Sequence, residues 1–417
     1  MRPPSSSTAD PVLQLIDKKP LWKVSPANGS YYINSVAVSA DGSRVVAGTF
    51  YHVYGAGESR RSPPGATPPP VATPSSSDNG TFGTYGYDQT GRLLWKDEFQ
   101  GWQGVYWVAV SADGSRAAAG GLMAETGPQG FVRAYDAANR GRMLLSHPTK
   151  KRVNQVSLSA DGAWLVSAAE TLLLFRAGLP YYQQTAEFTS PGNESIVSAS
   201  ISQDGGTVAY ADYAGWIGVL ANDNGALTPR ARWKVPGAGK SDFCHMISLA
   251  PDGRTFVAGG SGGQFFFFDV AKFIATGGPT VTYGTGVKEA VYGVAGSADG
   301  SLFAGVVNDG EAGKAYVARI VDGEAPAVPA LSLKRNPNCA AINVSGGMIR
   351  VVFADGHPDG TPGHFYLYSC PTGAGQPLLR LRWIYPTGNM SWPIAFSASG
   401  NAVVGGSDDS HLYYFTP

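Results

Sequence analysis

The sequence predicts an all-β fold in which eight four-stranded antiparallel sheets close into one ring. The first observation is a short phrase that recurs eight times and ends at Gly42, Gly114, Gly162, Gly205, Gly253, Gly300, Gly347 and Gly400. Successive glycines are 72, 48, 43, 48, 47, 47 and 53 residues apart. Such a period indicates units that bury their apolar faces only by stacking on one another. The second observation is a period-two alternation within each unit, which predicts half-buried strands and excludes a helical solenoid.

The first strand of each repeat precedes the recurring glycine. In the clearest copy Val36 and Val38 are apolar, and Ala37 between them is small. Large side chains on one face and small ones on the other suit an innermost strand, because neighbouring sheets converge near the axis. The Ala-Asp-Gly that follows predicts a tight turn, in which glycine adopts a positive φ.

Three further strands complete each repeat. Second strands are predicted at 45–48 and 256–259, aromatic third strands at 85–88, 265–269 and 364–368, and a fourth strand at 93–96. Four antiparallel strands joined by short turns, repeated around an axis, are the blades of a β-propeller.

The two ends of the chain are predicted to share the last blade. The final repeat supplies only three strands, at about 392–397, 401–407 and 411–416, and the missing fourth matches Leu21-Trp22-Lys23-Val24. We therefore predict eight blades, with seven as the alternative because the repeat at Gly347 lacks the aspartate. The predicted organisation is a tail at 1–19, a propeller at 20–417 and a Pro/Ser/Gly-rich insertion at 50–82 in the first blade.

Two motifs carry a resemblance to known repeats. The Ser-Ala-Asp-Gly strands and turns resemble WD40-like (YVTN-type) bacterial propeller repeats. The segment 87–95, Tyr-Asp-Gln-Thr-Gly-Arg-Leu-Leu-Trp, resembles the tryptophan-docking repeat of quinoprotein propellers. The resemblance covers nearly all of the chain past residue 20 and implies a fold, not an activity. The Trp-Asp dipeptide of true WD40 repeats is absent, and Gly-His does not recur from repeat to repeat. Trp22, Trp95, Trp233 and Trp383 are interpreted as structural.

Strand direction predicts where binding occurs. We call the side where the first strands begin face one, and the side that carries the Asp-Gly turns face two. The long connections all fall on face one, at 50–82, 122–129, 308–313 and 355–363. Long loops gathered on one side of a rigid scaffold are the usual place for a binding site.

A ring of side chains is predicted at the mouth of the central channel on face one. Eight residues before the repeat glycines stand Asn34, Tyr106, Asn154, Val197, His245, Tyr292, Cys339 and Trp392. Close to them in the sequence are Trp107, Gln155, Asp242, Lys288 and Glu289. Aromatic and amide groups around a concave site suit a small ligand or sugar. The predicted ligand-binding residues are Asn34, Tyr106, Trp107, Asn154, Gln155, His245, Tyr292 and Trp392. The alternative is that they only fill the top of the channel.

Composition argues against several functions. The net charge is zero, charged residues make up 15% of the chain, and no basic stripe suggests a nucleic acid. No stretch reaches the roughly 18 apolar residues of a membrane span. The three cysteines have no CxxC spacing, which argues against a disulfide framework and a zinc site. The cluster Asp355, His357, Asp359 and His364 is interpreted as a turn, so no metal or cofactor is predicted.

The sequence favours a non-catalytic binding scaffold whose partner is a protein or a second copy of the chain. The apolar run 12–16 in the polar tail suggests strand addition to a neighbour. A small molecule or glycan ligand is a further option. The alternative function is an enzyme, quinoprotein-like or a lyase or hydrolase, at the channel mouth. The first 20 residues lack a signal-peptide core, although low charge is typical of exported bacterial proteins.

Overall fold

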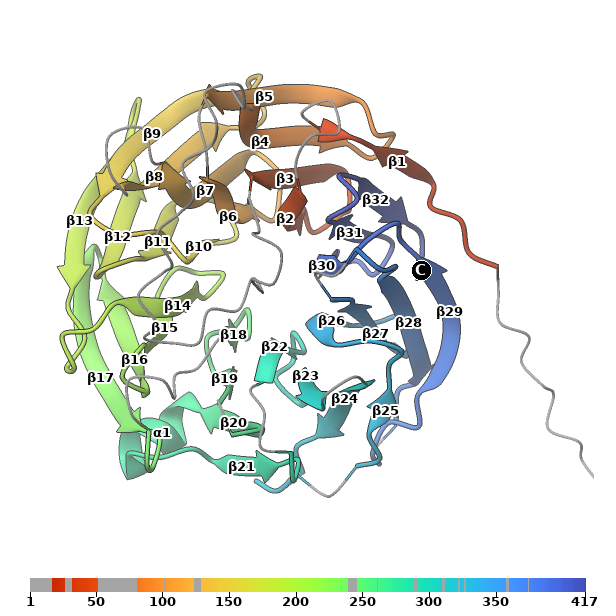
Figure 1. Ribbon diagram of the computed structural model, residues 1–417. Coiled ribbons are helices and arrows are strands. Elements are labelled where there is room, and N and C mark those ends of the chain that lie inside the picture. Colours follow the sequence, from red (N-terminus) through yellow and green to blue (C-terminus); the bar gives the residue numbers. More distant parts are fainter. Residues whose placement is uncertain are drawn as a thin grey trace, which may run out of the picture.

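A computed structural model describes residues 17–26, 32–51, 81–100, 103–123, 129–238, 246–260, 262–287, 291–309, 312–321, 323–325, 328–357, 360–373 and 375–417. These residues form antiparallel strands and one short helix. Figure 1 shows the sheets standing side by side around a central axis, each with its first strand innermost. The predicted all-β class and the four-stranded sheets are therefore confirmed.

Six of the sheets have four strands each. In five of them the strands follow one another in chain order. The first of these sheets contains β10 (Gln155–Leu158), β11 (Trp164–Ala168), β12 (Leu172–Ala177) and β13 (Tyr182–Phe188), and the second contains β14 (Ile196–Ile201), β15 (Thr207–Asp212), β16 (Trp216–Asp223) and β17 (Ala226–Lys234). The third contains β18 (Ile247–Leu249), β19 (Thr255–Gly259), β20 (Gln264–Asp269) and β21 (Val281–Gly284), the fourth contains β22 (Val291–Gly296), β23 (Leu302–Asp309), β24 (Ala312–Arg319) and β25 (Leu331–Ser332), and the fifth contains β26 (Pro337–Ser345), β27 (Met348–Asp355), β28 (His364–Pro371) and β29 (Arg380–Pro386).

The sixth four-stranded sheet joins the two ends of the described chain. It contains β30 (Ser391–Phe396), β31 (Val403–Ser407), β32 (Leu412–Phe415) and, beside β32, β1 (Trp22–Val24). Trp22 lies opposite Tyr414, and Val24 lies opposite Leu412. This is the closure that the sequence predicts.

The remaining strands form one eight-stranded sheet. It contains β2 (Tyr32–Val38), β3 (Arg44–Tyr51), β4 (Thr81–Asp88), β5 (Leu93–Gln100), β6 (Gln103–Val110), β7 (Arg116–Met123), β8 (Gln129–Asp136) and β9 (Arg142–Thr149). The meanders β2–β5 and β6–β9 join where Phe50 pairs with Gly104. A Cβ at Gly104 would lie 2.6 Å from the Phe50 Cα, so only glycine permits this approach. The sequence did not predict this junction.

Five of the Asp-Gly turns on face two, those at Asp41, Asp113, Asp161, Asp204 and Asp299, share one hydrogen-bond pattern. In the first, the Ser39 hydroxyl donates to Asp41 at 2.6 Å, and the same carboxylate accepts from the Ser43 N–H at 2.9 Å. Backbone hydrogen bonds then link one turn to the next, from Ser399 to Ala40, Ala40 to Ala112, Ala112 to Ala160, Ala160 to Gln203 and Gln203 to Pro251 (2.8–2.9 Å). We call this series the turn belt. It holds the sheets together at one rim of the channel.

The apolar core is divided into clusters between neighbouring sheets. One of them combines Ile217 and Val219 of β16 with Phe256 of β19 and Phe268 of β20, all buried. Helix α1 (Val270–Thr276) follows β20 and adds Phe273 to this cluster. Asp269 caps the helix by accepting from the Lys272 N–H. The sequence analysis did not predict this helix.

Candidate functional site

Arg152 organises a group of side chains at the face-one end of the innermost strands. It lies two residues before Asn154, in the segment that leads into the innermost strand β10. Its Nε donates to the Asn154 Oδ1 at 2.8 Å, and its Nη2 donates to the Tyr213 hydroxyl at 3.2 Å. The guanidinium carbon lies 4.5 Å from the centre of the Tyr106 ring. Three successive repeats thus contribute to one cluster, which we call the Arg152 cluster: Tyr106, Arg152, Asn154 and Tyr213.

Side chains from further repeats hold the Arg152 cluster in place. The Asn154 amide donates to the Ile196 carbonyl at 2.9 Å, at the start of β14. The Asn34 amide donates to the carbonyls of Val105 and Tyr106 at 3.3 and 3.2 Å. Each asparagine therefore bonds its own innermost strand to the next one around the ring.

Tyr106 is fixed by a second aromatic contact. Its ring meets that of Phe50 edge to face, with centroids 4.8 Å apart. Phe50 lies at the end of β3, where this strand joins β6. The junction between the two meanders therefore positions the ring on which Arg152 rests.

The guanidinium of Arg152 keeps its charge in a half-buried position. Burial alone would lower its pKa, but Tyr106 and Tyr213 raise the pKa above the ordinary value. In the described part of the chain no carboxylate forms an ion pair with Arg152. The N–H groups of this guanidinium that its neighbours do not use can donate to a carboxylate.

Two lysines extend the positive charge beside Arg152. The Lys151 ammonium donates to the Ser195 hydroxyl at 2.9 Å. The backbone N–H groups of Lys150 and Lys151 donate to the Glu170 carboxylate at 2.9 and 3.1 Å, which fixes the segment. Both lysines are exposed, so they present positive charge to solvent beside Arg152.

The structure brings together some of the predicted ligand-binding residues. Asn34, Tyr106 and Asn154 meet around Arg152. Trp107 is half-buried and packs into the cluster between neighbouring sheets, and Tyr292 packs into another. Trp392 is half-buried on β30, whereas His245 lies outside the described residues.

Gln155 has a structural position. Its side chain is buried, and its Oε1 accepts from the Ser198 hydroxyl at 2.5 Å and from the Ala199 N–H at 2.9 Å. Both donors belong to β14, the innermost strand of the next sheet. Gln155 therefore bonds two sheets together inside the protein.

Arg152 and Tyr213 were missed by the sequence analysis. The available signal was the run Lys150-Lys151-Arg152, the three consecutive cations directly before a first strand. Tyr213 follows the end of β15 and has no comparable signal, because its contact with Arg152 spans 61 positions.

Asp355, at the end of β27, forms a hydrogen-bonded unit with His364 and Tyr366 of β28. Asp355 is buried, accepts from the Tyr366 hydroxyl at 2.5 Å, and lies 3.0 Å from the His364 Nδ1. Asp359 lies outside the described residues. Among the described side chains, no group of three or more His, Cys, Asp and Glu converges as metal ligands would. Within the same residues, no helix is long and apolar enough to cross a bilayer.

Comparisons with known proteins identify a fold. No model of a known protein family matches the chain, and no curated protein is similar to it in sequence. Among solved structures, Sqt1 from Chaetomium thermophilum superposes with a TM-score of 0.67 at 13% identity, over 96% of this chain and 99% of that one. Sqt1 bound to the N-terminus of the ribosomal protein L10 gives 0.66 at 12%, covering 96% and 100%. Saccharomyces cerevisiae Sqt1 gives 0.66 at 9%, also covering 96% and 100%. The chain is similar in fold to these proteins over nearly its whole length.

Proposed function

We propose that this protein is a non-catalytic β-propeller scaffold that binds an acidic segment of a partner protein at the channel mouth. The observation that carries the proposal is Arg152, a half-buried cation held by three repeats, with no carboxylate partner among the described residues. Lys150 and Lys151 supply further positive charge at its edge. Charge-assisted hydrogen bonds to a carboxylate are among the stronger contacts a surface can offer.

The comparison supports the binding of a peptide by a protein of this fold. One structurally similar protein, Sqt1, was solved with the N-terminus of a ribosomal protein bound to it. At 12% identity this likeness concerns the fold and leaves the partner open. A ring of rigid sheets that presents loops on one face is suited to holding an extended peptide.

The test is selection of ligands from a displayed library of random linear peptides. We expect the wild-type protein to enrich peptides that carry Asp or Glu, and Arg152→Gln to bind the selected peptides at least about tenfold more weakly. Glutamine keeps a hydrogen-bonding group at the position and removes the charge. Fluorescence anisotropy of the labelled peptides measures the affinity.

The matched control is Arg230→Gln. Arg230 is an exposed arginine on the outermost strand β17, where it pairs with Asp223 at 3.4 Å. Its replacement should leave peptide affinity unchanged. Enrichment of neutral or basic peptides, or equal affinity for wild type and Arg152→Gln, would refute the proposal. Enrichment of glycans alone on an array would favour the small-ligand function instead.

We also propose that the ring has eight blades, within a domain at 20–417, with 1–19 as a tail and 50–82 as an insertion. Six four-stranded sheets and two meanders within the eight-stranded sheet support this number, because each corresponds to one recurring glycine. An electron-density map of the purified protein tests the count. A meander that departs from the ring would contradict it.

Self-association through the tail is a second candidate function. Lys18 donates to the Thr416 hydroxyl at 3.2 Å, so the chain enters the ring along its outer rim beside the last strand. Residues 17–20 also line a pocket with Ile384–Pro386 of β29. A segment that enters at an outer rim is placed to reach a neighbouring molecule. Light scattering of the full chain and of a variant without residues 1–16 tests this, and an unchanged mass excludes tail exchange.

A further inference from the structure

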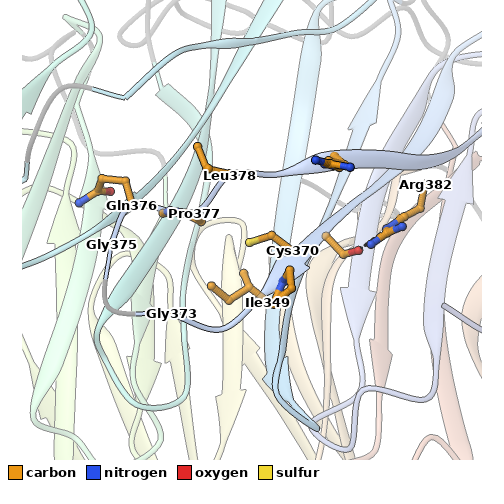
Figure 2. A pocket seen from close by; sticks show the side chains of 11 residues that line it. Ile349, Cys370, Gly373, Gly375, Gln376, Pro377, Leu378 and Arg382 are labelled. Atoms are coloured by element: carbon orange, nitrogen blue, oxygen red, sulfur yellow. Dashed lines mark hydrogen bonds between the residues drawn. The ribbon is translucent and has the colours of Figure 1, made fainter. Parts of the chain in front are cut away.

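A pocket of about 520 Å³ lies at the outer rim, far along the chain from the Arg152 cluster. Figure 2 shows its lining, which comes from the start of β27, the end of β28, the connection 371–379 and the start of β29. Because β28 runs away from face one, this connection lies on face two. The pocket is therefore separate from the channel mouth in both position and face.

The floor of the pocket is apolar. Ile349 and Cys370 are almost fully buried and belong to the core cluster beneath it. Pro371 and Pro377 line it as well, and the exposed side chain of Leu378 stands at its rim (Figure 2). An apolar group can therefore leave water here without displacing a side chain.

The connection that borders the pocket is fixed to the neighbouring sheet. The Arg319 N–H donates to the Gln376 Oε1 at 2.8 Å, and the Gln376 amide donates back to the Arg319 carbonyl at 2.9 Å. The Arg319 guanidinium also donates to the Gly375 carbonyl at 3.1 Å. This paired amide contact fixes one wall of the pocket to β24.

Two arginines supply its charge. Arg382 donates through Nε to the Ser369 hydroxyl at 2.6 Å, which leaves both of its terminal nitrogens available. Arg380 makes no ion pair with any carboxylate in the described part of the chain. None of the eleven lining residues is acidic, although acidic and basic residues are equally numerous in the whole chain.

We propose that this pocket binds a carboxylate that carries an apolar group. The arginines Arg380 and Arg382 hold the carboxylate, and the apolar group lies over Ile349 and Cys370. Two sources share this chemistry, namely a free amphipathic acid and the C-terminal residue of a peptide. The volume lies within the usual range for small-molecule sites, about 300–1,000 Å³, so it admits either of them.

The test uses N-acetyl-leucine and its uncharged counterpart N-acetyl-leucinamide as probes. Methyl NMR of the full chain, labelled at isoleucine, reports binding through the Ile349 signal, which Ile349→Val identifies. We expect the acid to move this signal and to bind at least about tenfold more tightly than the amide. We expect the double variant Arg380→Gln/Arg382→Gln to bind the acid and the amide with equal affinity. Two further probes then distinguish the two sources of the ligand. One is a peptide that ends in leucine with a free carboxylate, and the other is octanoate.

The matched control is Arg142→Gln. Arg142 begins β9, the same position in its sheet that Arg380 has in β29, and it is exposed. Its replacement should leave the Ile349 response unchanged. Three results would each overturn the proposal. The first is equal affinity for the acid and the amide, and the second is an unchanged response of the Ile349 signal in the double variant. The third is inorganic phosphate that binds as tightly as N-acetyl-leucine. None of these results depends on the Arg152 cluster.

Discussion

Trp22 lies directly against Gly91, in the turn that joins β4 to β5. The indole N–H donates to the Gln89 carbonyl at 2.9 Å, and a Cβ added to Gly91 would lie 2.9 Å from the Trp22 ring. Trp22 belongs to β1, which completes the sheet of the C-terminal strands. The closing strand is therefore bonded to two sheets at once.

Gly91→Ala should destabilise the protein by about 2–4 kcal/mol, from left-handed backbone strain together with overpacking. Gly91 has φ of +83°, so alanine is unfavourable there even before it meets the indole. Gly237 has φ of +75° with no atom within 4 Å of an added Cβ. Gly237→Ala therefore measures the strain alone, and equal losses of free energy of unfolding in urea would contradict the contact with Trp22.

Gln155→Leu should cost about 2–4 kcal/mol, because it leaves two buried donors on β14 unpaired. These are the Ser198 hydroxyl and the Ala199 N–H. Ser157→Ala removes one longer contact to the same strand, 3.3 Å from the Ile201 N–H. It should therefore cost less than Gln155→Leu in the same thermal melts. The reverse order would show that Gln155 does not bond the two sheets.

The Asp-Gly turns should make stability depend on acid pH. The Ser202 hydroxyl and then the Gly206 N–H lower the pKa of Asp204 below its ordinary 3.8. Because the unfolded chain then binds more protons at low pH, this stabilisation is complete above about pH 5 and is lost as the pH falls through the folded pKa.

The variant that tests this is Ser202→Ala. Its urea midpoint should lie below that of the wild type at pH 7, and the difference should shrink below pH 4 as Asp204 becomes protonated. Ser167→Ala is the control, because the buried Ser167 hydroxyl has no hydrogen-bond partner among the described residues. A difference for Ser202→Ala that stays constant with pH would rule out the contribution of Asp204.

Tyr106 should contribute to stability through its ring. Tyr106→Phe keeps both the contact with Arg152 and the edge-to-face contact with Phe50. Tyr106→Ala loses both, together with apolar contact area, and should cost roughly 2–4 kcal/mol more than the phenylalanine variant. Thermal unfolding of the two variants measures the difference. If both melt alike, the ring does not support Arg152.

The local residue pattern made the strands predictable, but the contacts between sheets could not be predicted from it. The alternation around Val36–Val38 and the turn residues at 41–42 predicted strand, direction and face without reference to the rest of the chain. Arg152 meets Tyr106 and Tyr213 because three neighbouring sheets converge toward the axis, which no spacing in the sequence expresses. The junction of β3 with β6 likewise depends on a glycine whose neighbour is Phe50, 54 positions earlier in the chain.

Proline at position 251 interrupts the turn belt. Its carbonyl accepts from Gln203, but its nitrogen carries no hydrogen, so this turn cannot donate to the next one. The sheets β18–β21 and β22–β25 consequently meet on face two without a main-chain bond between their corners.

Among the described residues the belt begins again only at Ser399, so the turns of β18–β21, β22–β25, β26–β29 and β30–β32 are not joined to one another in this way. Side chains bond these sheets instead, as where the Gly296 N–H donates to the Ser248 hydroxyl at 3.1 Å and the Asn343 amide donates to the Ser397 carbonyl at 3.1 Å. Loss of such side-chain contacts would therefore loosen this arc before the rest of the ring.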